Sequence, residues 1–195
     1  MSDTKVYHGS CHCGNVKYQV RLTLPPLITT DPTAKTVSIY KCNCTTCQKM
    51  GFFHCRPINP EDDFILTSPD PSELGDYRVY DKKHGWYFCK NCGVRTFGLG
   101  GAWEETELDV DEWAGREKSK DGTEKVWKTK SADCMVTVDG KQTTRNLHYL
   151  SVNAVTLENV DLREWHEKEW MFYVDCLRTP EQGPRFGKPY AGGMY

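Results

Sequence analysis

The sequence lacks the features that would commit the protein to nucleic acid or to a membrane. Its formal net charge is -2 and its isoelectric point is about 6.3, so no basic excess is available to hold a phosphate backbone. No window approaches the ~18 consecutive apolar residues of a membrane span, and the opening residues lack the apolar segment of a secretory signal. We therefore expect a cytoplasmic protein with neither nucleic acid nor a membrane as its partner.

Helical signal is also scarce. Short alternating runs rich in β-branched and aromatic residues are separated by Pro, Gly, Asp and Asn, which is typical of antiparallel strands. The expected strands are residues 15–22, 36–42, 63–68, 77–80, 85–89, 94–99, 134–138 and 148–155. Only two short helical turns are expected, one from a Thr cap in "TTCQKM" and one over residues 161–170 from an Asp cap. The sequence predicts a mainly β fold.

The length of 195 residues suits one domain with a full core, and any second domain would have to be small. Residues 100–133 mix charges with Gly and scattered Trp, and we interpret them as a long insertion. Residues 177–195 are rich in Pro and Gly and are expected to form an extended C-terminal tail. We therefore expect a single domain over residues 1–195.

Cysteine is what the chain does have, with ten in all. A reducing cytosol keeps thiols from pairing, so this number indicates metal binding or catalysis. Seven of them fall into three local groups: Cys11 and Cys13; Cys42, Cys44 and Cys47; and Cys89 and Cys92. Cys134 and Cys176 lie in or after apolar runs and are expected to be buried core thiols.

Two of the groups are pairs that each present two adjacent thiolates, and each pair is followed by a glycine. Joining them gives a four-thiolate tetrahedral zinc site, which has no room for a substrate and holds structure only. Its ligands are Cys11, Cys13, Cys89 and Cys92. Because the two pairs are far apart in the sequence, the ion closes a long loop, so loss of the metal is expected to be strongly destabilising.

The middle group, Cys42, Cys44 and Cys47, supplies only three ligands, which is the arrangement of a catalytic zinc with one open position. Cys55 or His54 lies close enough in the sequence to be the fourth ligand, which would instead give a second structural zinc. Both alternatives are open at this level.

Three thiolates on Zn²⁺ leave a net negative charge, so nearby cations are expected to help, and the same cations could bind substrate carboxylates. The nearest in the sequence are Lys41, Lys49 and Arg56. The aromatic residues Phe52, Phe53 and Trp86 flank the cysteine motifs and could line a pocket.

The motifs "GSCHCGNVKY", "CNCTTCQKMG" and "FCKNCGVRTFG", in this order, resemble the glutathione-dependent formaldehyde-activating enzyme family, to which centromere protein V is also related. The match runs from about His8 to Phe97, and "LHYLSVNAVTLENVDL" is similar to the closing strand of the family. The resemblance implies a small β-tent fold with two Zn²⁺ per chain. Carried over by motif, the structural ion falls on Cys11, Cys13, Cys89 and Cys92, and the catalytic ion on Cys42, Cys44 and Cys47.

The resemblance also implies an enzyme, a carbon–sulfur lyase that adds the glutathione thiol to formaldehyde to give S-(hydroxymethyl)glutathione. The partners would be a glutathione-like thiol and a small carbonyl compound, and a homodimer is possible. The chain departs from the family pattern in the insertion, the tail and the "GFFHC" that follows the middle group. Two alternatives are therefore kept: a non-catalytic zinc module that binds a protein, and the same chemistry on a different carbonyl or thioether substrate.

Overall fold

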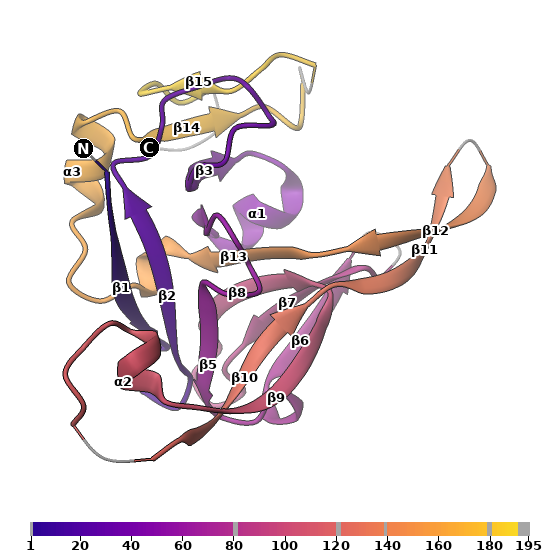
Figure 1. Cartoon of the computed structure of the whole chain (residues 1–195). Helices are drawn as coiled ribbons and strands as arrows, with labels where there is room; N and C mark the ends of the chain where they lie inside the picture. The colour runs from indigo at the N-terminus through magenta and orange to yellow at the C-terminus, as the bar shows by residue number, and fades with distance from the viewer. Residues whose placement is uncertain (1, 80–81, 120–121, 139, 179–180, 191–195) are drawn as a thin grey trace.

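The computed structural model describes residues 2–79, 82–119, 122–138, 140–178 and 181–190. Strands account for 47% of the chain and helices for 12%, which confirms the predicted mainly β fold. The strands form a five-stranded sheet, an eight-stranded sheet and a separate hairpin (Figure 1). Within the described ranges, no helix has the length and apolar character that crossing a membrane requires.

The five-stranded sheet is antiparallel throughout and has the order β1-β2-β5-β10-β9. Its strands are β1 (Asp3–Ser10), β2 (Lys17–Leu24), β5 (Phe64–Ser68), β9 (Ala102–Leu108) and β10 (Glu124–Lys130). The last two come from residues 100–133, for which the sequence predicted no strand. The helix between them, α2 (Val110–Trp113), is capped by Asp109, and Val110 and Trp113 pack against this sheet. The insertion is thus part of the layered structure.

The eight-stranded sheet has the order β15-β14-β3-β4-β13-β8-β7-β6. Its strands are β3 (Ser38–Cys42), β4 (His54–Arg56), β6 (Gly75–Val79), β7 (His84–Phe88), β8 (Arg95–Gly100), β13 (Tyr149–Asn153), β14 (Met171–Val174) and β15 (Arg185–Phe186). All pairs are antiparallel except β14 and β3, which are parallel. Helix α3 (Leu162–Glu167), capped by Asp161 as predicted, lies between β13 and β14 in the chain.

All eight strands expected from the sequence are present, although Tyr80, at the end of one of them, lies outside the described residues. The expected tail contributes β15, while residues 179–180 and 191–195 also lie outside the description. Strands β11 (Ala132–Val138) and β12 (Lys141–Leu147) form a hairpin that projects away from the two sheets in Figure 1.

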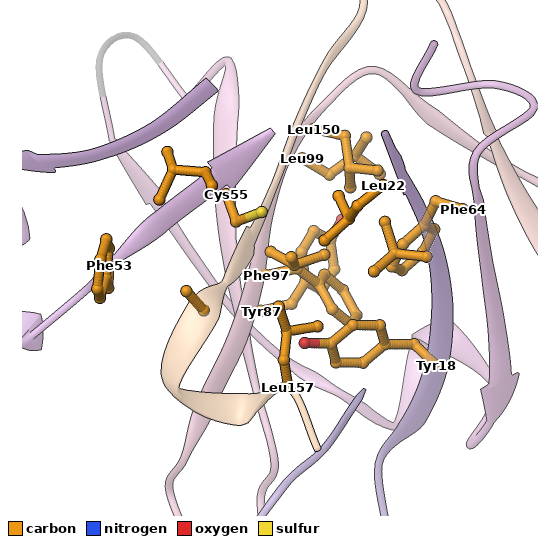
Figure 2. Packing of buried hydrophobic residues seen from close by; sticks show 14 of the residues in the cluster. Tyr18, Leu22, Phe53, Cys55, Phe64, Tyr87, Phe97, Leu99, Leu150 and Leu157 are labelled. Carbon is orange, nitrogen blue, oxygen red and sulfur yellow. The ribbon is translucent and has the colours of Figure 1, made fainter. Parts of the chain in front are cut away.

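The main core lies between the two sheets, where side chains from both meet (Figure 2). The ring centre of Tyr18 is 5.6 Å from that of Phe64, which belongs to the same five-stranded sheet. It is 5.8 Å from the ring centre of Phe97, which belongs to the eight-stranded sheet. The Tyr18 hydroxyl would be costly to bury alone, and it is 2.7 Å from Oγ1 of Thr156. One face of the eight-stranded sheet therefore packs in this core.

Candidate metal centres and their pocket

The first cysteine cluster joins two chain turns that are far apart in the sequence. The ligand atoms of its four members all lie within 4.8 Å of one another: Cys11, Cys13, Cys89 and Cys92. Each turn closes through a glycine at positive φ, +75° at Gly14 and +76° at Gly93, and the N–H groups of these glycines donate to the carbonyls of Cys11 and Cys89. This conformation is strained for residues with a side chain, which explains a glycine after each pair.

The sulfur positions of this cluster fit a tetrahedral zinc ion. The Sγ atom of Cys13 is 3.5 Å from that of Cys11 and 3.6 Å from that of Cys89. Four sulfurs at ~2.3 Å from a common ion would be ~3.8 Å apart, so only small shifts are needed. A hydrogen bond from Asn91 lowers the pKa of Cys13 to about 6, which favours the thiolate that a metal needs.

The second cluster is built where β3 ends and helix α1 (Thr45–Met50) begins (Figure 1). Cys42 is the last residue of β3, Cys44 is the cap of the helix and Cys47 lies in it, and their sulfurs are within 4.8 Å of one another. The Cys47 N–H donates to Sγ of Cys44 at 3.4 Å, so a cysteine takes the capping role that the sequence assigned to a threonine. The extended backbone of Cys44 is the reason, because a cap residue lies outside the helical conformation.

The donor set of this triad also fits a divalent cation. The neighbouring sulfurs of Cys44 and Cys47 raise the pKa of Cys42 far above that of an ordinary thiol. The raised pKa keeps the Cys42 thiol protonated without a metal, and a bound cation would replace that proton and offset the repulsion among three thiolates held this close.

Strand β4 separates the two residues that could have closed the triad. Successive side chains of a strand point to opposite faces, and Cys55 is fully buried in the core, where Figure 2 shows its sulfur directed toward the packed leucines. His54 points to the other face and its Nε2 is 3.2 Å from Sγ of Cys47. Neither residue belongs to the group of mutually close ligand atoms that Cys42 and its two partners form. Among the residues that the structure describes, no fourth His, Cys, Asp or Glu has a ligand atom within 4.8 Å of all three sulfurs.

His54 is buried among hydroxyl groups and aromatic rings. Its Nδ1 is 3.0 Å from Oγ of Ser151 and 3.2 Å from the hydroxyl of Tyr149. Burial lowers the pKa of His54 to about 3, so the ring is neutral near pH 7. With Nδ1 facing two hydroxyls that can donate, the proton is best placed on Nε2, from which it donates to Cys47.

A cavity of about 700 Å³ opens beside the triad on the face of the sheet opposite the core. Side chains alternate between the two faces of a strand, so the half-buried Tyr40 and Phe172 face the cavity, whereas their neighbours Ile39 and Met171 belong to the core. Trp86 also lines the cavity, as expected from its place near a cysteine motif. Phe52 packs behind the triad against Trp86, and Phe53 lies in the core, so neither lines it.

Of the three expected cations, only Arg56 lines the cavity. Its guanidinium is 4.8 Å from the ring centre of Tyr149, and none of the described acidic side chains pairs with it. Lys41 is buried on the core side of β3, with Nζ 4.9 Å from the ring centre of Phe53. Lys49 is exposed and does not line the cavity. Arg56 is therefore the cation placed to meet an anionic group of a substrate.

The hydrogen bonds of Asn43 to the segment after β14 belong to the site, but no local sequence pattern predicts them. Asn43, between two triad cysteines, is buried, and its Nδ2 donates to Oδ1 of Asp175 at 2.7 Å. Its Oδ1 accepts from the N–H groups of Cys176 at 2.7 Å and Leu177 at 3.2 Å. These bonds tie the segment after β14 to the triad turn and place Cys176 and Leu177 on the cavity wall. Asn43 and Asp175 are 132 residues apart, so no local pattern links them.

The expectation that Cys134 and Cys176 are buried core thiols is wrong. Cys134 is half-buried on the projecting hairpin, and Cys176 is exposed at the cavity. Both positions follow from tertiary placement. Cys134 lies on the two-stranded β11–β12 hairpin, outside the two larger sheets, and the chain after β14 turns toward the triad.

Comparison with known proteins gives one family match, to the model described as glutathione-dependent formaldehyde-activating enzyme, over residues 6–111. No curated protein matches the chain. A solved structure of a Rhodobacter sphaeroides protein, a structural genomics target, is similar at 18% identity and a TM-score of 0.41, over 80% of this chain and 93% of that one. The family match spans both cysteine clusters and more than half of the sequence, and the chain belongs to the glutathione-dependent formaldehyde-activating enzyme family.

Proposed function

We propose that this chain is a zinc-dependent carbon–sulfur lyase that acts on adducts of a glutathione-type thiol with a carbonyl compound, S-(hydroxymethyl)glutathione being the simplest. It would hold two Zn²⁺, a structural one on Cys11, Cys13, Cys89 and Cys92 and a catalytic one on Cys42, Cys44 and Cys47. The observation that carries the proposal is the three-cysteine cluster that opens onto a cavity of about 700 Å³ while Cys55 points into the core. A purely structural site would have been closed by a fourth ligand.

Zinc bound to the triad supplies a Lewis acid that favours ionisation of a substrate thiol placed beside it. In the forward direction a C–S bond forms between the thiol and the carbonyl carbon, and the thiol proton ends on the former carbonyl oxygen. The reverse direction breaks the same bond and returns the proton to sulfur. The balance is complete without an oxidant or a protein nucleophile.

The residues of the chain have separate roles in this proposal. His54 donates from Nε2 to Cys47 and holds its sulfur in one orientation, because Ser151 and Tyr149 fix the ring from the other side. Arg56 binds a carboxylate of the thiol substrate, since no described acidic side chain occupies it. The Trp86 and Phe172 rings line the cavity beside the triad and would shield a bound substrate from water.

The test is catalysis by the zinc-loaded full chain. Exchange NMR of glutathione with formaldehyde measures formation and breakdown of the adduct against the uncatalysed rate. We expect acceleration by the wild type and loss of it in Cys47→Ser, while Cys134→Ser, on the projecting hairpin, serves as the matched control and retains it. A zinc-loaded wild type that gives only the uncatalysed rate would contradict the proposal.

Three statements remain predictions from the sequence: a single domain, a cytoplasmic location and a possible homodimer.

A further inference from the structure

A second cavity adjoins the first. It encloses about 250 Å³ beneath the loop that connects β2 to β3, and its wall includes Leu27 and Ala34 from that loop and Phe186 from β15. Three residues line both cavities: Ser38, Arg56 and Phe172. The two spaces therefore share a boundary, with Arg56 beside it.

A row of aromatic rings crosses that boundary. His54, Tyr40, Phe172 and Phe186 are direct neighbours on four adjacent strands. The Tyr40 ring is 4.3 Å from that of His54 and almost parallel to it, and it is 5.2 Å from that of Phe172. The Phe172 ring is 5.4 Å from that of Phe186. The row begins at the imidazole beside Cys47 and ends in the second cavity, which makes a continuous aromatic wall.

The second cavity lies beyond the reach of a one-carbon group. Ser38, at the boundary, and Cys42, in the triad, are four residues apart on β3, or roughly 13 Å at ~3.3 Å per residue. Formaldehyde bound at the triad would leave this space and most of the aromatic row uncovered.

The charged side chains on the wall of the second cavity indicate whether an arm of the thiol or an arm of the carbonyl partner fits there. Within the part of the chain that the structure describes, Arg56 is the only cation on this wall. Hydrogen bonds from Thr33 lower the pKa of Asp31, which therefore carries a negative charge there at neutral pH. A glutamyl or glycyl arm of a glutathione-type thiol ends in a carboxylate, which suits Arg56 at the boundary. It does not suit the rest of the wall, where most of the lining residues are apolar, the others are uncharged hydroxyl residues, and Asp31 is negative. An uncharged apolar arm suits it better, and such an arm comes from the carbonyl partner.

We propose that the two cavities form one binding site and that the outer cavity holds an apolar arm of several carbons, or one aromatic ring, carried by the carbonyl partner of the thiol. This inference rests on the proposed lyase function and narrows its substrate class from formaldehyde to longer aldehydes and their thiol adducts.

Binding of unreactive adduct mimics tests the inference apart from catalysis. Calorimetry with the zinc-loaded full chain compares S-hexylglutathione with S-methylglutathione, neither of which needs a C–S bond to form or break. Burial is worth about fourfold in affinity per methylene, so we expect the hexyl compound to bind more than tenfold tighter.

Variants on the outer cavity make the test specific. Ala34→Phe fills the outer cavity and should lower the hexyl-to-methyl affinity ratio, whereas Lys35→Phe, exposed on the same loop and outside the cavity wall, should leave the ratio unchanged. Phe186→Ala removes the outer ring and should lower the same ratio, which keeps the test valid if one variant does not fold. Equal affinities in the wild type, or an unchanged ratio in both cavity variants, would overturn the inference.

Turnover separates this inference from the proposed function. With glutathione fixed, the wild type should show a higher kcat/KM for hexanal than for formaldehyde. Catalysis on formaldehyde without any preference for the hexyl compound would refute the role proposed for the outer cavity, but not the lyase function. A hexyl preference in binding with no turnover of any aldehyde refutes the lyase function and supports a binding site made of the two cavities.

Discussion

The two cysteine clusters should contribute very differently to stability, because they close loops of very different length. The first cluster joins Cys13 to Cys89, 76 positions apart, whereas the second joins residues within a single turn. In the chain-entropy model, a cross-link over the longer loop stabilises by about 4.5 kcal/mol and one over a five-residue loop by about 2 kcal/mol. The same reasoning applies to a metal cross-link.

The perturbation removes two ligands from each cluster. Cys13→Ser/Cys92→Ser disrupts the first, and Cys42→Ser/Cys44→Ser disrupts the second, and none of these four residues is fully buried, so packing costs are small and similar. We expect the first variant to lose about 2.4 kcal/mol more than the second at 25 °C. Urea unfolding of zinc-loaded protein, with zinc measured per chain before and after, gives both quantities.

The opposite order would refute this reasoning. If the triad variant is as destabilised as the first-cluster variant, the long-range cluster does not act as the main cross-link. A first-cluster variant that keeps two bound zinc ions and full stability would show that those cysteines are not metal ligands.

The other predictions concern single residues. Cys55→Ala should lower the free energy of unfolding by about 1–2 kcal/mol through a core cavity but leave zinc content and turnover unchanged, and loss of one zinc on analysis would contradict the described core position. Arg56→Gln should raise the KM for the thiol at constant zinc content, and an unchanged KM with a lower kcat would exclude a carboxylate contact. His54→Phe retains a ring on Tyr40 but removes the N–H donor to Cys47, and it should weaken zinc retention by the triad by about 10–100-fold in a chelator competition, with the first cluster unaffected. Backbone N–H groups of α3 lower the pKa of Asp161, so its contribution to stability is present above the ordinary carboxyl pKa and is lost as the pH falls through the lowered value. Acid unfolding of Asp161→Asn should therefore show a weaker pH dependence in that range than the wild type. Identical curves for the two proteins would exclude a stabilising contribution of the Asp161 carboxylate at the cap.

Local patterns were sufficient for much of the architecture. The alternation of residues such as those in β2 and β13 predicted strands that are present, and Asp161 marked the start of α3, because both signals act over a few residues. The sequence predicts no strands over residues 100–133, because the charged residues of this segment mask the alternating pattern. Its strands β9 and β10 are stabilised by pairing with each other and with β5, which a local reading does not detect.

The sequence by itself determined which cysteines could share an ion, since Cys-x-Cys, Cys-x-x-Cys and their following glycines are constraints of a few backbone bonds. It could not decide between Cys55 and an open position at the triad. That choice depended on the face of β4 that meets the core, which only the pairing of β4 between β3 and β13 fixes. The tertiary structure likewise placed Arg56 at the cavity and Lys41 in the core, and it brought Asn43 to Asp175, because contacts between distant strands leave no periodic signal in the chain.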